Sequence, residues 1–300
     1  MSLATTTSAR SPAGPPLAPG TRPAPGYEVL AHLDRTGWLD LYDAWSEERD
    51  CRCVVKVLRP DQRDDARLAE RLVREGRWLQ SFTHPHLVRA YETFASPEPL
   101  VVLETLTGET LDHLIDRLPR RAAAEDVAVL GVQLCSALHY LHGQGLLHLD
   151  LKPANVVVEG ARAKVLDLSV AHAPGIAPAG VGTFGYMSPE QARGGALSAA
   201  ADVWGIGVTL YELATGDVPF DIGDTVDGST TTDGAAADWY PQLEEPAPPV
   251  RAHRRLPPAL AAAIDGCLRP DPADRPSVSE LSAALDTTLL RRRRDTPEAG

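Results

Sequence analysis

The sequence is poor in cysteine and in positive charge. Its 4 cysteines among 300 residues form no paired framework, which predicts a reducing compartment. Cys51 and Cys53 lack the second ligand pair that a structural zinc site needs, so we expect no metal there. The 29 Lys and Arg against 41 Asp and Glu give a net charge of -12. This argues against nucleic acid as a main partner, because phosphate backbones attract clustered basic side chains.

Long apolar runs are also missing. No run approaches the ~18–20 residues of a membrane span, and residues 1–10 contain no signal-peptide core. We therefore expect no membrane span and a cytoplasmic location. A chain of 300 residues, 43% hydrophobic and 23% charged, can bury a substantial core in one two-lobed domain or in two small ones. The sequence makes no prediction of oligomeric state.

Two segments have compositions typical of poorly ordered chain, and a third, at the C-terminus, is basic. Residues 1–26 are rich in Pro, Ala, Thr and Ser and are expected to be a disordered tail. Residues 221–248 predict a mobile surface loop. Residues 289–300 are expected to be a basic C-terminal tail. For its arginine run, residues 291–294, we favour a solvated helix end, with an acidic lipid surface or partner as the alternative.

The remaining chain changes character near residue 106. Residues 27–106 have mostly strand-like apolar alternation, interrupted by a helical pattern at residues 66–82. The stretch 107–288 is mainly helical. Strands followed by helices predict an α+β fold with two lobes, a small mainly-β N-lobe with one helix and a larger mainly-α C-lobe. The C-lobe helices are expected at residues 110–118, 124–143, 201–215, 258–268 and 277–290.

A predicted hairpin carries groups suited to phosphoryl transfer. Residues 156–158 and 163–166 predict two short strands joined by a turn. Antiparallel pairing places Asn155, before the first strand, beside Asp167, after the second. Their oxygens suit a hard cation such as Mg²⁺. Asp150 and Lys152 lie just upstream, and together these residues form a phosphoryl-transfer constellation.

A lysine and a glutamate predict a second feature. Residues 51–58 predict a strand that carries Lys56, and Glu75 lies on the apolar face of the helix at residues 66–82. Because an unpaired buried charge is costly, Glu75 needs a partner, and Lys56 is the obvious candidate. The alternative is a solvated glutamate that only grazes the interface.

These residues resemble the catalytic and metal loops of the eukaryotic-type (Hanks-type) Ser/Thr protein kinases, close to their bacterial branch. The family patterns H-R-D-x-K-x-x-N and D-F-G correspond to residues 148–155 and 167–169. The resemblance implies ATP and Mg²⁺ as cofactors, with Lys56 and Glu75 positioning phosphates. It further implies that Asp150 accepts the hydrogen bond of the substrate hydroxyl, that Lys152 offsets charge and that the metal is held at the predicted hairpin.

The resemblance assigns further residues. Segment 180–185 matches G-x-G-x-x-G but follows no strand, so we interpret it as the substrate-side segment of a kinase, which favours a protein substrate. Thr183 there and Lys152 are typical of Ser/Thr kinases. Near the hinge, backbone groups of Glu104 and Leu106 would bind adenine, with Leu103 as gatekeeper. The expected structural residues are His148, Asp202 and the ion pair of Glu190 with Arg275.

The sequence departs from the family pattern around the nucleotide. Leu33, Leu41 and Val54 correspond to residues that line the nucleotide, but Val54 replaces a small alanine. The three glycines of the phosphate loop are replaced by Asp34, Thr36 and Leu39. Glycine there lets backbone N–H groups approach phosphates closely, so ATP binding should be weakened.

Two other departures concern activation. Leu149 replaces the arginine that binds a phosphorylated activation loop in many kinases, and Ser169 replaces the metal-loop glycine. Ser169 is also the only phosphorylatable residue between residues 168 and 182. We therefore expect no activation by phosphorylation of that loop.

The sequence thus predicts a Mg-dependent serine/threonine protein kinase that transfers the γ-phosphoryl of ATP to protein hydroxyls. A pseudokinase that binds proteins with weak or no nucleotide turnover is the first alternative, because of the altered phosphate loop. A small-molecule phosphotransferase is the second, and the substrate-side segment disfavours it.

Overall fold

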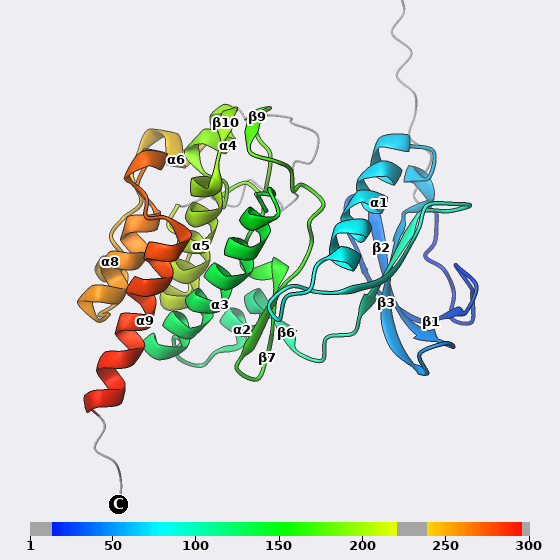
Figure 1. Ribbon diagram of the computed structural model, residues 1–300, viewed down its shortest axis with the longest axis horizontal. Helices are drawn as coiled ribbons and strands as arrows, with labels where there is room; N and C mark the ends of the chain where they lie inside the picture. Colours follow the sequence, from blue (N-terminus) through cyan, green and yellow to red (C-terminus); the bar gives the residue numbers. More distant parts are fainter. Residues whose placement is uncertain (1–13, 221–238, 296–300) are drawn as a thin grey trace, which may run out of the picture. The chain divides into compact units, whose positions relative to one another are not determined.

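The computed structural model describes residues 14–220 and 239–295, without the side chains of residues 290–295. Within that part, the chain forms two compact units, and Thr105 is the last residue of the smaller one. The sequence places this division after residue 106. Residues 84–88 belong to the larger unit although they precede the boundary. The α+β class is confirmed, since the smaller unit is mainly strands and the larger mainly helices (Figure 1).

In its described residues, the smaller unit is an antiparallel sheet of five strands with one α-helix and a short 3-10 turn at Pro60–Gln62. The strand order is β1-β2-β3-β5-β4. Helix α1 (Ala66–Ser81) packs against β4 and β5, and Asp65 caps its start by accepting hydrogen bonds from the backbone N–H groups of Arg67 and Leu68. The strands in chain order are β1 (Tyr27–Arg35), β2 (Leu39–Ser46), β3 (Cys51–Leu58), β4 (Ala90–Phe94) and β5 (Leu100–Glu104).

Residues 14–26 correct the prediction of a disordered tail as far as they are described. Their backbone bonds to β1 through Gly20 N–H to Val29 O (2.8 Å) and Val29 N–H to Thr21 O (2.9 Å). Ala24 and Leu17 pack against the core of the sheet. Single apolar residues without periodicity are enough to hold this segment in place, because the sheet supplies the surface against which they pack. Residues 1–13 lie outside the described part.

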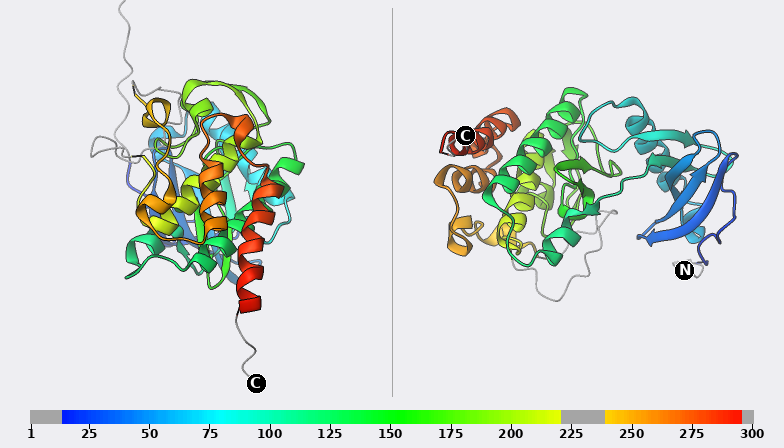
Figure 2. Two further views of the ribbon diagram at one scale, coloured as in Figure 1. Left: turned by 90° about the vertical axis from the view of Figure 1, so that its left-hand side faces the viewer. Right: turned by 90° about the horizontal axis from the view of Figure 1, so that it is seen from below.

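The larger unit is built around helix α5 (Ala199–Thr215), nearly all of whose side chains are buried. Helices α3 (Ala124–Gly143) and α8 (Pro258–Cys267) pack against it, and α9 (Val278–Asp295), red in Figures 1 and 2, packs along α3. The shorter helices are α2 (Leu111–Arg117), α4 (Pro189–Arg193), α6 (Pro241–Glu244) and α7 (Val250–His253). Short 3-10 turns cover Pro153–Asn155 and Pro272–Asp274.

Two small sheets complete the larger unit. The first contains β6 (Glu109–Thr110), β7 (Val156–Glu159) and β8 (Arg162–Val165), and the second pairs β9 (Gly175–Ala177) with β10 (Gly195–Leu197). The hairpin of β7 and β8 is the one that the sequence predicts. It ends beside the candidate catalytic residues.

One further prediction of poor order is corrected in part, and the favoured prediction of a helix end at residues 291–294 agrees with the structure. Residues 239–248 contain α6, and Tyr240 packs its ring 5.5 Å from that of Phe184. Residues 221–238 lie outside the described part. The expected basic tail begins inside α9, whose backbone runs to Asp295, while residues 296–300 are not described. Helix propensity of the arginine run explains the extension.

The contact of α5 with α8 gives a test of core packing. A Cβ at Gly207 would lie 2.5 Å from Cys267 Cβ, whereas one at Gly266 would meet nothing closer than 3.8 Å. Gly207→Ala is expected to lower the free energy of unfolding by about 1–3 kcal/mol, because overpacking outweighs the gain in helix propensity. Gly266→Ala, the control, should leave it unchanged or raise it. Urea unfolding measures both, and equal effects would contradict the packing argument.

Candidate active site

The loop before β7 is held by a buried aspartate of α5. Asp202 accepts hydrogen bonds from the backbone N–H groups of His148 (2.9 Å) and Leu149 (2.8 Å), and its Oδ2 lies 2.7 Å from His142 Nε2. The His148 ring accepts from Asp150 N–H at Nδ1 (3.2 Å) and lies 3.1 Å from Leu166 O at Nε2. These contacts fix the backbone of residues 148–150, which leads into the Asp150 side chain.

Leu149 has a strained backbone. Its φ of 65° lies in the left-handed region, which costs a non-glycine residue on the order of 1–3 kcal/mol. Besides the bond from its N–H to Asp202, its carbonyl accepts from Gln191 Nε2 at 2.7 Å. The surroundings therefore determine this conformation, which sets the direction of the Asp150 side chain.

Asp150, Lys152 and Thr183 form a closed triangle of polar contacts. The Thr183 hydroxyl donates to Asp150 Oδ1 (2.6 Å) and accepts from Lys152 Nζ (2.6 Å), and Lys152 Nζ lies 3.6 Å from Asp150 Oδ2. Burial raises the pKa of the Asp150 carboxyl, against the lowering effect of Lys152 and of the Thr183 hydroxyl. The triangle places a carboxylate, a cation and a hydroxyl from two segments, 31 to 33 residues apart, at one point.

Asn155 and Asp167 lie at the mouth of the hairpin, as the sequence predicts. The N–H of Leu166 donates to Asn155 O at 2.8 Å, which brings the two ends together. Asn155 Nδ2 donates to Asp150 O (2.8 Å) and Oδ2 (3.1 Å), and this orients the amide so that its oxygen is the atom available as a ligand. Asp167 has a φ of 49° and accepts from Ser169 N–H at 2.7 Å.

This pair fits magnesium. Within residues 14–220 and 239–295, no group of three or more His, Cys, Asp or Glu side chains gathers as a protein-only metal site. Mg²⁺ is usually held by one or two carboxylates together with phosphate oxygens and water. One carboxylate and one amide oxygen are therefore an adequate protein contribution.

The smaller unit supplies a buried ion pair. Lys56 of β3 donates to Glu75 Oε1 of α1 at 2.8 Å, and both side chains are buried. The sequence predicts this pair. Lys56 lies opposite Leu41 of β2, and Val54, two residues earlier, lies opposite Leu103 of β5. Alternation along the strand puts Val54 and Lys56 on one face of the sheet.

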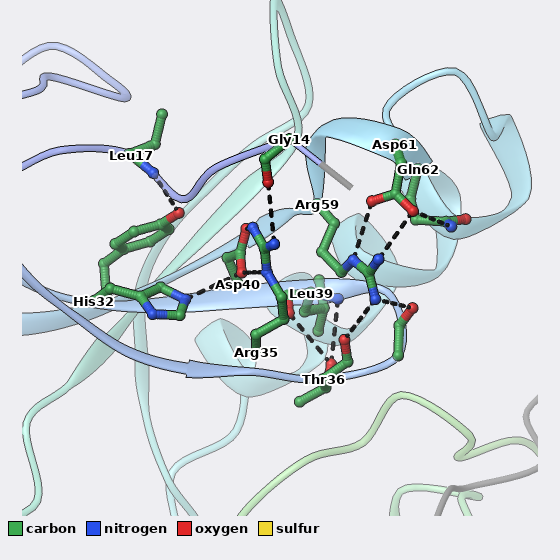
Figure 3. A network of polar contacts seen from close by, with 12 residues as sticks. Gly14, Leu17, His32, Arg35, Thr36, Leu39, Asp40, Arg59, Asp61 and Gln62 are labelled. Carbon is green, nitrogen blue, oxygen red and sulfur yellow. Dashed lines mark hydrogen bonds and ion pairs between the residues drawn. The ribbon is translucent and has the colours of Figure 1, made fainter. Parts of the chain in front are cut away.

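The other nucleotide residues expected from the sequence differ in exposure. Leu33 is 54% exposed, whereas Leu41, Val54 and Leu106 are half-buried. The Glu104 N–H donates to Arg89 O (3.0 Å), so this N–H belongs to the sheet. Thr36 and Leu39, at two glycine positions, form a closed turn through Thr36 N–H to Leu39 O at 2.9 Å (Figure 3).

Glu190 and Arg275 form a two-pronged ion pair in the larger unit. Arg275 NH1 and NH2 donate to the two carboxylate oxygens of Glu190 at 2.6 and 2.9 Å. The guanidinium also lies 4.9 Å from the centre of the Trp204 ring and donates to the carbonyls of Arg269, Ala200 and Pro270. The pairing of Glu190 with Arg275 is the one expected from the sequence, and in the structure it anchors α4 to α5.

Gln191 is a positioning residue that sequence reasoning missed. Its Nε2 donates to Leu149 O (2.7 Å) and to Val181 O (2.9 Å), which ties the catalytic loop to the substrate-side segment. Ser188 and Gln191 also form a capping box at the start of α4. The S-x-x-Q spacing could have indicated that box from the sequence, but not the reach to Leu149.

Comparison with known proteins decides the family. A family profile described as "Protein kinase domain" matches residues 38–285. The chain belongs to the protein kinase family. It is 34% identical over 253 residues to serine/threonine-protein kinase PknB of Mycobacterium leprae, a match that covers 79% of this chain and 38% of that protein. It is 33% identical over 288 residues to serine/threonine-protein kinase pkn3 of Myxococcus xanthus, covering 89% and 51%.

Solved structures agree on the fold. The crystal structure of the Mycobacterium tuberculosis PknI kinase domain aligns with a TM-score of 0.67 at 24% identity, over 91% of this chain and 99% of that one. The chain spans about two fifths of the length of the PknB relatives. Among its described residues, no helix has the length and apolar character needed to cross a bilayer.

The kinase activation segment is held by apolar contacts. Leu149, at the position of the usual arginine, is buried in a cluster with Leu147, Ala177 of β9, Leu197 of β10 and Ala201. The strands β9 and β10 pair in register, with Gly175 opposite Leu197. The segment is thus fixed by a strand pair and an apolar cluster, at the place where many kinases have an arginine that binds a phosphate.

A half-buried glutamate beside this segment gives a test of pH dependence. Burial raises the pKa of Glu212 to about 7, helped by the charges of Asp112 and Asp116 and opposed by the hydrogen bond from the Tyr186 hydroxyl (2.8 Å). Folding therefore favours the protonated form, and stability falls as pH rises from the unfolded value of 4.5 through 7.

Glu212→Gln is accordingly expected to raise the free energy of unfolding at pH 8 by about 1–3 kcal/mol, and to change it little at pH 5. Denaturant unfolding at both pH values measures this, with the exposed Glu244→Gln as control. A gain that is equal at the two pH values would contradict the assignment.

Proposed function

We propose that this chain is a Mg-dependent serine/threonine protein kinase that transfers the γ-phosphoryl of ATP to a protein hydroxyl. The observation that carries the proposal is the triangle of Asp150, Lys152 and Thr183. It joins a carboxylate that can accept a hydroxyl's hydrogen bond to a cation that can offset phosphate charge. Relatives at 33–34% identity named serine/threonine-protein kinases support the same reaction.

Each candidate site residue of the larger unit has a role in this proposal. Asp150 accepts the hydrogen bond of the substrate hydroxyl and thereby orients the hydroxyl oxygen toward the γ-phosphorus of ATP. Lys152 neutralises charge that develops on the transferred group. Asn155 and Asp167 hold Mg²⁺, which supplies charge neutralisation on the phosphates when bound. Thr183 keeps the Asp150 and Lys152 side chains in position.

In the smaller unit, Lys56 binds phosphate oxygens of ATP. Glu75 holds the ammonium group at 2.8 Å, so Lys56 is positioned before the nucleotide arrives. Val54, Leu33 and Leu41 are apolar and would line the adenine, while backbone groups of Glu104 and Leu106 would bind its edge. His148, Asp202, Glu190 and Arg275 support the site structurally without contacting the nucleotide.

We further propose a protein substrate and a cytoplasmic location. The segment from Gly180 to Glu190 is fixed by Gln191 and Arg275, and this segment is the part of a protein kinase that faces the substrate chain. ATP, Mg²⁺ and reduced cysteines are all found in the cytoplasm, and the cysteines of the described residues are free thiols.

Purified protein with labelled ATP, Mg²⁺ and a basic protein substrate tests the proposal. Wild type is expected to label itself or the substrate, and removal of Mg²⁺ by a chelator should abolish the label. No labelling under any condition would overturn the kinase assignment.

A pseudokinase is the second candidate, and the loop between β1 and β2 favours it. Asp34, Thr36 and Leu39 stand where close phosphate approach needs glycine. Binding of Mg-ATP without transfer, measured by calorimetry beside the labelling assay, would support this candidate over the kinase.

A further inference from the structure

The tip of the β1–β2 hairpin, which corresponds to the phosphate loop of kinases, and the adjoining residues 32–42 are held by side-chain contacts (Figure 3). At its tip, Thr36 N–H donates to Leu39 O (2.9 Å), and Leu39 N–H donates to Thr36 Oγ1 (3.2 Å). The four residues from Thr36 to Leu39 are therefore closed by hydrogen bonds into one tight turn. A glycine at position 36 would have no side-chain oxygen to accept the second of these bonds.

An ion pair between a half-buried arginine and a buried carboxylate connects the two strands next to this turn. Arg35 and Asp40 lie opposite each other in the register of β1 and β2. Arg35 Nε donates to Asp40 Oδ1 at 2.6 Å and NH2 donates to Oδ2 at 2.8 Å, which is a bidentate pairing. His32 Nε2 lies 3.1 Å from Oδ1 of the same carboxylate. Three contacts thus fix one fully buried carboxylate across the hairpin.

The protonation of Asp40 agrees with this geometry. Burial by itself would raise the pKa of the Asp40 carboxyl, but the hydrogen bonds from Arg35 and His32 outweigh it and hold that pKa below its usual value. The carboxylate therefore stays charged inside the protein. Such a pair resists opening, because separation would leave a buried charge without its partner.

The same arginine fastens the N-terminal segment to the hairpin. Arg35 NH1 donates to Gly14 O at 3.0 Å, and Leu17 N–H donates to the Tyr42 hydroxyl at 2.8 Å. Residues 14–26, which we call the N-terminal strap, continue along β1 and bury Ala24 in the core of the sheet. The hairpin is thus tied to a segment that precedes it in sequence.

A second arginine fixes the tip to the end of β3. Arg59 NH1 donates to Thr36 O (3.2 Å) and Gly37 O (3.1 Å), and the Arg59 N–H donates to Trp38 O (3.0 Å). Asp61 holds the guanidinium with two contacts of 3.0 Å. Trp38 is buried, and Arg71 of α1 lies 4.8 Å from the centre of its ring. The tip is therefore connected to β3 and to the helix that carries Glu75.

The Arg35–Asp40 pair acts on the hairpin without facing Lys56. Leu41 is the register partner of Lys56, so alternation places Asp40 on the opposite face of β2. Tyr42, on the same face as Asp40, is buried in the core with Ala24. Any effect of the pair on a nucleotide must therefore pass through the backbone of the hairpin.

We propose that Arg35 and Asp40 are positioning residues for ATP binding. The two residues hold the β1–β2 hairpin in one conformation, where other kinases use a flexible glycine-rich loop. The proposal rests on the proposed kinase function. A fixed hairpin loses little conformational freedom when ATP binds, and this preorganisation offsets the poorer approach of its backbone to the phosphates.

The decisive variant is the double substitution Arg35→Met with Asp40→Leu. It removes both charges together, so no buried charge is left unpaired, and replacement of such a pair by apolar residues is often neutral for stability. The proposal predicts a KM for Mg-ATP raised about 5–10-fold, with kcat within about twofold of wild type. Hydrogen exchange of the amides at residues 14–20 and 36–39 should speed up in the same variant.

Arg49→Met is the matched control. The Arg49 side chain is 26% exposed, as is that of Arg35, and it pairs with Glu92 at 2.9 Å in the same unit. The Arg49→Met substitution should leave the KM for Mg-ATP unchanged. A double variant with wild-type KM, or a control with the same rise, would show that the pair is merely structural and would overturn the proposal.

Calorimetric titration with Mg-ATP separates this inference from the kinase assignment. If wild type binds Mg-ATP but transfers no phosphoryl group, only the proposed kinase activity is overturned. The dissociation constants of Mg-ATP for wild type, double variant and control would then replace KM as the test of the hairpin proposal. Wild type that binds no Mg-ATP would overturn both.

Discussion

Asp150→Asn is expected to lower kcat by about 10²–10⁴-fold, because an amide cannot take the hydroxyl proton or carry the charge that a general base needs. The KM for ATP should change little, since Asp150 faces the hydroxyl and not the nucleotide in the proposed mechanism. Burial raises the pKa of this carboxyl, so its charge opposes folding, and the variant should melt no lower than wild type. Steady-state kinetics and a thermal melt measure the two effects.

Asp126→Asn serves as the control for this substitution. Asp126 is exposed on α3 and should tolerate the same change without loss of activity. If Asp150→Asn kept its kcat within about tenfold of wild type, the general-base role would be excluded. A loss of activity together with a large fall in melting temperature would point to a folding defect instead.

Arg275→Met is expected to lower the free energy of unfolding by about 3–5 kcal/mol, which is typical when one partner of a buried ion pair is removed. The variant leaves the Glu190 carboxylate without its two hydrogen bonds and also frees the carbonyls of Arg269, Ala200 and Pro270. The Arg275 guanidinium is fully buried, so water cannot replace these contacts cheaply. Urea unfolding measures the loss.

Two further variants define the cause. Adding Glu190→Gln to Arg275→Met should recover part of the loss, because it removes the unpaired charge. Arg22→Met removes an exposed arginine that contacts Glu28 and Glu47, and it should cost less than about 1 kcal/mol. Equal losses for Arg22→Met and Arg275→Met would rule out burial as the reason.

The features predicted from the sequence are those that depend on local pairing. A hairpin with a short turn needs no distant information, so Asn155 and Asp167 could be placed side by side from alternation alone. The pairing of Lys56 with Glu75 was predicted because a buried charge needs a partner, with a solvated glutamate as the alternative. The long helices were found because their apolar periodicity is strong.

The features missed depend on register and on distant contacts. The pairing of Arg35 with Asp40 requires the register of β1 and β2, which contains two irregularities that no pattern in the sequence reveals. Gln191 reaches a carbonyl 42 residues away, and only the folded loop brings them together. The N-terminal strap was predicted as disordered because its contacts come from isolated residues such as Leu17 and Ala24.

The apolar cluster around Leu149 has a consequence for control of the proposed enzyme. A phosphate held by an arginine weakens as ionic strength rises and can be removed by a phosphatase. Packing of Leu149 against Ala177 and Leu197 excludes water instead, and neither salt nor a phosphatase reverses it. The proposed enzyme would therefore need no phosphate on residues 168–182 to hold its activation segment in place, and a phosphatase would not switch it off there.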